Sequence, residues 1–240
     1  MSKLSGLLFD KNGTLIDFHK SWVAPMWGLA DVLAGEDGDL AALLMQEAGL
    51  EPATQRVRPD SILSVGTARD LANAWQPFLP AIGGEALVGR INRFPLRAGK
   101  TTAEPVLPLE TFFGALRDCG LALGVATSDS EASAHALLAG SQSAAHVGFV
   151  SGYDSGHGSK AGPGMALAFA EAIAAPPERL AVIGDNLTDL LMGRQAGYGC
   201  LIAVLTGTGS EESLAVYADV VLPSIAELKD WLLQEGLIED

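Results

Sequence analysis

A short apolar stretch near the start of the chain, residues 7–15, limits the possible folds more than any other segment. It reads Leu-Leu-Phe-Asp-Lys-Asn-Gly-Thr-Leu, so an apolar run ends in an acid and a glycine follows shortly after. This pattern is typical of a buried strand that ends in a turn. It predicts that the strand carries one carboxylate, Asp10, to the edge of a sheet.

The C-terminal part of the chain alternates short apolar runs with amphipathic segments of helical period. Strands that alternate with helices indicate a parallel sheet covered by helices on both faces. The predicted fold class is therefore α/β, with a Rossmann-like core. The expected strands are residues 121–126, 147–150, 180–183, 200–204 and 220–221, and the expected helices are residues 109–119, 131–139, 163–173, 189–196 and 225–233.

The segment between these two parts, residues 17–98, has a different pattern. Apolar residues recur at helical spacing, separated by prolines and a glycine pair, and no strand pattern is visible. We therefore predict an α/β core domain of residues 1–16 and 99–240, with a small all-helical domain of residues 17–98 inserted into it. We expect the tryptophans of the inserted domain to pack in its core rather than to stack on a ligand; they are Trp22, Trp27 and Trp75.

The composition limits the classes of partner and the compartment. A hydrophobic fraction of 48% with 18% charged residues predicts a well-buried core. The net charge of −14 repels nucleic acid and anionic lipid, so neither is expected as a partner. The two cysteines, Cys119 and Cys200, do not suggest a disulfide framework, and neither a signal peptide nor a membrane-spanning run is visible. We therefore expect a cytoplasmic protein.

Polar residues follow three of the predicted strands. Asp10, Thr127 and Asp185 each come directly after an apolar run. Because sites in parallel sheets lie beyond the carboxyl ends of the strands, we expect these three side chains to lie at one edge. Asp10 can attack phosphorus and form an acyl phosphate, or it can simply cap the turn after its strand.

Three further features fit a phosphate and metal site, and each has a structural alternative. Thr127 and Ser128 can bind phosphate oxygens, and the same segment also suits a helix N-cap. Lys160 lies in a glycine-rich loop from which it can reach a phosphate, although solvated loop lysines occur in the same setting. Asp185 and Asp189 suit Mg²⁺, or they interact as acids with the start of a helix.

Two other patterns carry less weight. Gly99-Lys100-Thr101 is similar to the end of a P-loop, but neither the first glycine of that motif nor a preceding strand is present. The four histidines have no metal-ligand spacing. His19 and His157 lie near the candidate site segments in sequence and are therefore candidates for contact with a substrate.

Taken together, these segments resemble the haloacid dehalogenase-like (HAD) superfamily. Its four motifs appear in order: residues 9–15, then Thr127 after an apolar strand, then Lys160, then Gly184-Asp185 with Asp189. The resemblance extends over essentially the whole chain. Residues 17–98 are similar to the helical cap domain of the superfamily, and residues 189–197 are similar to the corresponding helix of phosphoglycolate phosphatase-like members.

The resemblance implies a Mg²⁺-dependent phosphomonoester hydrolase that acts on a small phosphorylated metabolite through an aspartyl phosphate at Asp10. Asp10, the backbone carbonyl of Asn12 and Asp185 would hold Mg²⁺. Asp189 would support the metal or its waters.

The resemblance also implies how the phosphate is held. Thr127, Ser128 and Lys160 would bind the phosphoryl oxygens and stabilise the transferring group. The cap would set specificity, with one or two nearby arginines on a substrate anion. The candidates are Arg56, Arg58, Arg69, Arg90, Arg93 and Arg97.

The chain departs from the family pattern at Asn12, where related phosphatases usually carry an aspartate. That aspartate protonates the leaving group and then activates water, and an amide can do neither. We therefore expect metal and phosphate binding to remain while turnover falls by about 10²–10⁴-fold. Three explanations stay open: an introduced replacement of a natural aspartate, a natural member with a slow or altered second step, or a non-catalytic protein that binds a phosphorylated ligand.

Overall fold

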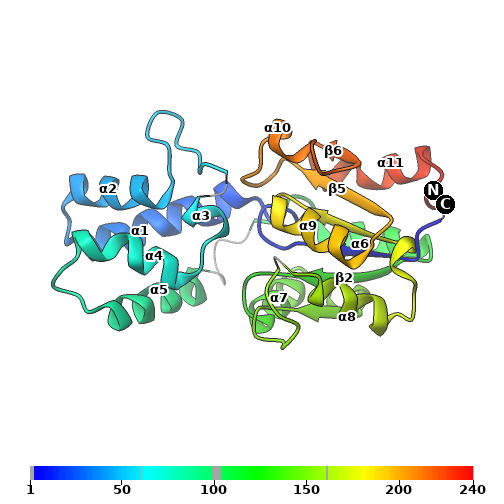
Figure 1. The fold of residues 1–240 in the computed structure, drawn as a ribbon, viewed down its shortest axis with the longest axis horizontal. Helices are drawn as coiled ribbons and strands as arrows, with labels where there is room; N and C mark the ends of the chain where they lie inside the picture. The colour runs from blue at the N-terminus through cyan, green and yellow to red at the C-terminus, as the bar shows by residue number, and fades with distance from the viewer. Residues whose placement is uncertain (1–2, 60, 99–103, 161, 240) are drawn as a thin grey trace. The chain divides into compact units, whose positions relative to one another are not determined.

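The computed structural model describes residues 3–59, 61–98, 104–160 and 162–239. The chain divides into two compact units, one formed by Met1–Asp17 with Pro105–Asp240 and the other by Phe18–Glu104 (Figure 1). Among the described residues, every strand belongs to the first unit. No helix in the described ranges combines the length and the apolar character needed to cross a membrane.

The first unit contains a six-stranded sheet in which all neighbouring strands are parallel, in the order β3-β2-β1-β4-β5-β6. The first strand in the sequence, β1, lies in the middle of the sheet between β2 and β4. The strand order runs from β1 to one edge through β2 and β3 and to the other edge through β4, β5 and β6. Where the strand order reverses in this way, ligand sites lie beyond the carboxyl ends of the central strands, here β1 and its neighbours. The predicted α/β class is confirmed. The strands are β1 Gly6–Phe9, β2 Ala122–Ala126, β3 Phe149–Ser151, β4 Leu180–Gly184, β5 Cys200–Val204 and β6 Val220–Leu222.

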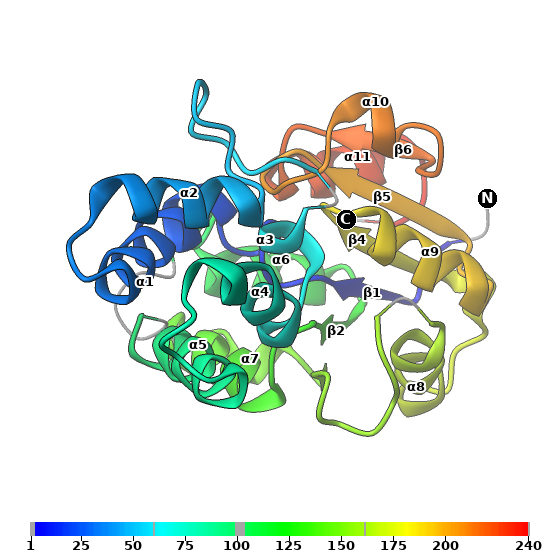
Figure 2. The ribbon, with the colours of Figure 1, turned by 60° about the vertical axis from the view of Figure 1, so that its left-hand side comes forward.

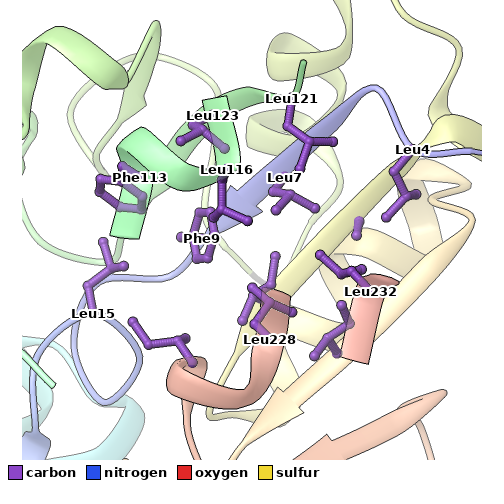
Figure 3. Packing of buried hydrophobic residues seen from close by; sticks show 14 of the residues in the cluster. Leu4, Leu7, Phe9, Leu15, Phe113, Leu116, Leu121, Leu123, Leu228 and Leu232 are labelled. Carbon is purple, nitrogen blue, oxygen red and sulfur yellow. The ribbon is translucent and has the colours of Figure 1, made fainter. Parts of the chain in front are cut away.

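Alternate residues of the strands face two separate layers of helices. On β1, Leu7 and Phe9 belong to a cluster with α6, α7 and α11, as Figure 3 shows for the α6 and α11 contacts. Leu8 faces the other way and packs with α8 and α9, which lie side by side (Figure 2). The helices of this unit are α6 Leu109–Asp118, α7 Glu131–Gly140, α8 Gly164–Ala172, α9 Leu187–Ala196, α10 Glu211–Leu214 and α11 Leu228–Gln234.

Several predicted helix ends are wrong by a few residues. The predicted helix of residues 163–173 begins at Gly164 because Pro163 is its N-cap. α7 continues through Gly140 instead of ending before it, and its C-cap is Ser141. α9 begins earlier than predicted because the Asn186 side chain caps it. The last predicted helix is a 3₁₀ turn, Ile225–Glu227, followed by α11.

The second unit is a small helical bundle with its own apolar core. Trp75 is fully buried there and its Nε1 donates to the carbonyl of Leu44 at 2.7 Å, while Trp22 and Trp27 pack against the same cluster. The expected core role of the tryptophans is thus confirmed. The elements are a π-helical turn His19–Val23, α1 Ala24–Ala34, α2 Gly38–Ala48, α3 Ile62–Val65, α4 Ala68–Trp75, a 3₁₀ turn Gln76–Phe78 and α5 Gly84–Ala98. The P-loop-like residues 99–101 lie outside the described residues.

Candidate active site

Asp10 lies at the carboxyl edge of the sheet, directly after β1. Its backbone N–H donates to the carbonyl of Ile183 in β4 at 2.8 Å, which extends the ladder by one residue. The Oδ1 atom pairs with the Lys160 ammonium. The Oδ2 atom is buried and has no hydrogen-bond partner among the described residues. Because an unpaired buried carboxylate oxygen is costly, this atom marks a place for a cation or a ligand donor.

Asp185 and Asp189 come to the same place from β4 and α9. Together with Asp10 they form a group that we call the acid cluster, in which one oxygen of each carboxylate lies within 4.8 Å of the others. All three side chains are buried. Asp189 also accepts a hydrogen bond from the Asn186 N–H at 3.1 Å and so completes the capping box of α9. The capping and site interpretations of this aspartate are therefore compatible.

The acid cluster holds more negative than positive charge. Lys160 is the buried cation beside it, with Nζ 2.7 Å from Asp189 Oδ1. Burial raises the pKa of Asp185 well above its usual value, and the charges of Asp10 and Asp189 raise it further. Burial, with a further contribution from Asp10 and against the opposing effect of Lys160, raises the pKa of Asp189 to about 6. Burial alone would lower the pKa of Lys160, but the two carboxylates that it contacts raise it overall.

The carboxylate oxygens of the acid cluster fit a hard divalent cation. Mg²⁺ prefers oxygen ligands, and the acid cluster offers carboxylate oxygens on two strand ends and one helix. The orphaned Oδ2 of Asp10 points to the same conclusion. A bound cation would reduce the repulsion among the carboxylates.

Two glycines allow neighbouring backbone to pack directly against Asp185. Gly13 has φ +87°, and a Cβ there would lie 2.6 Å from the carboxylate. A Cβ on Gly207 would lie 1.9 Å from Asp185 Oδ2. Any side chain at either position would therefore displace this carboxylate.

The loop after β5, residues 205–209, is a part of the site that the sequence analysis missed. Thr208 donates its backbone N–H to Asp185 Oδ2 at 2.8 Å, and its hydroxyl lies 3.3 Å from the same atom. Thr206 Oγ1 donates to the carbonyl of Gly13 at 2.6 Å and so joins this loop to the turn after β1. The polar Thr-Gly-Thr-Gly run at the end of the predicted strand 200–204 was the available signal.

Thr127 follows β2 and is fully buried at the same edge. Its N–H donates to the carbonyl of Ser151 in β3 at 2.9 Å, and its Oγ1 accepts from the Asp129 N–H at 3.1 Å. Ser128 lies exposed in the turn that follows. The cap of α7 is Ser130, whose side chain accepts from the N–H of Ser133.

The side chain of Asn12 lies beside Asp129, a residue that the sequence analysis did not single out. Asn12 Nδ2 donates to Asp129 Oδ2 at 2.9 Å. The buried Lys11 ammonium donates to the same oxygen and to Ser133 Oγ, the latter at 2.8 Å. We call these four residues the Asp129 cluster. Burial alone would raise the pKa of Asp129, but the charge of Lys11 and the hydrogen bonds hold it below its usual value.

The remaining predicted candidates are two histidines and six arginines, and their contact with a substrate stays a prediction. His157 Nδ1 is 3.0 Å from Ser151 Oγ, and its ring stacks on Phe149. His19 belongs to the helical unit, where its ring meets Phe18 edge-on. The candidate arginines belong to the helical unit as well, and one of them, Arg69, forms an exposed ion pair with Glu85. The first unit alone thus brings together Asp10, Asn12, Thr127, Ser128, Lys160, Asp185 and Asp189 at the carboxyl edge of its sheet.

The chain belongs to the haloacid dehalogenase-like hydrolase family, whose model matches residues 4–197. The resemblance inferred from the four motifs is thereby confirmed. A phosphoglycolate phosphatase of Xylella fastidiosa (strain 9a5c) is 30% identical over 200 residues, which are 82% of this chain and 79% of that protein.

Solved structures share the fold. A predicted phosphoglycolate phosphatase from Haemophilus somnus 129PT matches with a TM-score of 0.73 at 13% identity, over 96% of this chain and 99% of that one. A HAD family hydrolase from Deinococcus radiodurans R1, solved with bound phosphate and sodium, matches with a TM-score of 0.69 at 20% identity, over 99% of both chains. At such identities the likeness shows the fold alone.

Proposed function

We propose that this protein is a Mg²⁺-dependent phosphomonoester hydrolase that acts on small phosphorylated metabolites through an aspartyl phosphate on Asp10. The observation that carries the proposal is the acid cluster, in which three buried carboxylates and Lys160 meet at the carboxyl edge of the parallel sheet, where the strand order reverses. The phosphoglycolate phosphatase relative supports the same chemistry.

In this proposal Asp10 is the nucleophile. One of its oxygens attacks the phosphorus, and the bond to the leaving alcohol breaks as an acyl phosphate forms. Lys160 holds a phosphoryl oxygen and keeps Asp10 in place, and Thr127 with the exposed turn at Ser128 binds the other oxygens. Because Lys160 and Thr127 are buried, they would interact more strongly with the charge of the phosphoryl group than exposed groups would.

Asp10, the backbone carbonyl of Asn12 and Asp185 would hold the metal ion, with Asp189 supporting it. When bound, Mg²⁺ would neutralise charge on the phosphoryl group and on the crowded carboxylates. The protein groups set its position, because Asp185 is fixed by Thr208 and by the close approach of Gly13 and Gly207. The helical unit, in the role of a cap, would select the substrate.

A second function, non-catalytic binding of a phosphorylated ligand, is favoured by one observation. The amide of Asn12 stands where related phosphatases carry an acid/base, and it cannot transfer the proton that each half of the reaction needs. A protein that binds phosphate and metal but never forms the acyl phosphate would fit the same site.

The two functions are separated by mass spectrometry of the chain after incubation with Mg²⁺ and a panel of small phosphate esters that includes phosphoglycolate. The hydrolase proposal expects a phosphoryl adduct on Asp10 that needs Mg²⁺ and disappears slowly, with phosphate release about 10²–10⁴-fold below a typical phosphatase. Ligand binding by calorimetry without any adduct or release would support the binding protein. An adduct on another residue would contradict the role of Asp10.

A further inference from the structure

Asn12 does not stand alone in the structure, because it shares an acceptor with a buried cation. Asp129 Oδ2 receives the Asn12 amide at 2.9 Å and the Lys11 ammonium as well. Asp129 comes from the turn after β2, whereas Lys11 and Asn12 come from the turn after β1, so the contact joins two neighbouring strand ends.

The chemistry of the contact fixes which group must stand at position 12. An ionised carboxylate accepts hydrogen bonds and donates none, so the side chain facing Asp129 has to present an N–H or O–H. The amide of Asn12 does so. An ionised aspartate at position 12 would instead place a second acceptor-only group at about the same distance, so the hydrogen bond to Asp129 Oδ2 would be lost and the two carboxylates would repel each other.

Asp129 cannot easily move away from such a neighbour. Its backbone N–H donates to Thr127 Oγ1, and its carbonyl accepts from the Tyr153 N–H at 2.9 Å. Its carboxylate is also the charge partner of Lys11, whose side chain is only 5% exposed. Because a buried ammonium needs its counter-charge, turning Asp129 outward would leave Lys11 unpaired.

We propose that Asn12 and Asp129 are a matched pair, in which Asp129 is the positioning residue that requires an amide rather than a carboxylate at position 12. This inference rests on the proposed function, in which position 12 is the place where an acid/base would act. Asp129 orients the Asn12 side chain and the Lys11 ammonium at the edge of the site. It follows that Asn12→Asp alone does not restore an acid/base in working position, whereas Asn12→Asp combined with Asp129→Asn does.

The test compares four forms: the chain as it stands, Asn12→Asp, Asp129→Asn and the double exchange. The first measurement is Tm, which does not depend on activity. Asn12→Asp should lower Tm by several degrees, and the double exchange should recover most of that loss, so that the two changes are strongly non-additive. Asn73→Asp, an exposed change of equal charge on α4, is the control and should shift Tm little.

The second measurement is the release of phosphate and the lifetime of the phosphoryl adduct. Asn12→Asp alone should gain little, Asp129→Asn alone should stay slow, and the double exchange should gain about 10²–10⁴-fold. Rescue of this kind is not expected if Asp129 has only a structural role.

The outcomes separate the pair from the proposed function. Additive Tm changes, or full activity of Asn12→Asp alone, would overturn the matched pair. Strong Tm coupling with neither adduct nor release in any form would support the pair and contradict the hydrolase. If Asn12→Asp fails to fold, folding of the double exchange supports the pair, and its failure to fold overturns it.

Discussion

The two clusters on either side of the turn after β1 differ in how completely their charges are paired. The acid cluster combines three carboxylates with the ammonium of Lys160, and within the described part of the chain Asp10 Oδ2 has no hydrogen-bond partner. The Asp129 cluster sets one carboxylate against one ammonium, and Asn12 and Ser133 supply the remaining hydrogen bonds. Negative charge exceeds positive charge in the first cluster, whereas the second pairs one carboxylate with one ammonium. This difference marks the first as a place for ligands and the second as a support.

The largest expected effect comes from changing Asp10, the proposed nucleophile of the acid cluster. Asp10→Asn should abolish the phosphoryl adduct and lower phosphate release on the order of 10⁴-fold or more, as the loss of other enzymic nucleophiles does. Mass spectrometry and a phosphate-release assay measure both quantities. Asp118→Asn, an exposed change at the end of α6, is the matched control and should leave them unchanged. An adduct that persists in Asp10→Asn would show that the nucleophile is another residue.

A smaller effect is expected when Asp185, a proposed metal ligand, loses one of its supporting groups. Thr208→Val keeps the size of the side chain but removes the hydroxyl that lies 3.3 Å from both Asp185 Oδ2 and Asn186 Nδ2. Groups that orient a metal ligand typically contribute 10–100-fold to affinity, and the backbone N–H of Thr208 remains in place. We therefore expect Mg²⁺ affinity, measured by calorimetry, to fall by about 10-fold.

The control for this change is Thr111→Val on the exposed face of α6, which should leave Mg²⁺ affinity unaltered. Equal affinity of the Thr208→Val form and the parent chain would mean that the loop after β5 does not support the metal site.

Substitutions in the Asp129 cluster should lower the free energy of unfolding rather than the affinity for Mg²⁺. Lys11→Met removes the charge partner of Asp129, whose side chain is 28% exposed, and should lower the free energy of unfolding by about 1–3 kcal/mol. Denaturant unfolding measures this loss. Lys3→Met breaks the exposed pair with Glu239 and should change the free energy of unfolding far less, because solvent screens this pair. If Lys11→Met weakens Mg²⁺ binding as strongly as Thr208→Val, the two clusters are not independent.

The contrast between the clusters also explains what could be predicted from the sequence. The acid cluster comes from acids that directly follow apolar strands, and parallel strands bring their carboxyl ends to one edge. Asp10 and Asp185 were therefore found from pattern alone, and the sheet that positions them was predicted from the alternation of strands and helices. Helix ends were less predictable because caps decide them, as at Asn186 and Pro163.

The Asp129 cluster could not be predicted in this way. Its contacts are side-chain hydrogen bonds across more than a hundred residues of sequence, and Lys11 has no local pattern that distinguishes a buried lysine from a solvated one. The loop after β5 was missed for a different reason. It supports Asp185 through backbone N–H groups and through glycines that leave room, and neither depends on a side chain with obvious chemistry.

The smallest expected effect comes from removing the Ser133 hydroxyl, the fourth member of the Asp129 cluster. Ser133 Oγ accepts from Lys11 at 2.8 Å, and such a bond contributes about 0.5–1.5 kcal/mol. Ser133 lies inside α7, where alanine is preferred over serine by a few tenths of a kcal/mol, so Ser133→Ala alone should change stability little. The informative quantity is the coupling with Lys11→Met in a double-mutant cycle of unfolding free energies, expected to be about 0.5–1 kcal/mol. A coupling near zero would mean that Lys11 is held by Asp129 alone and that the cluster ends at the carboxylate.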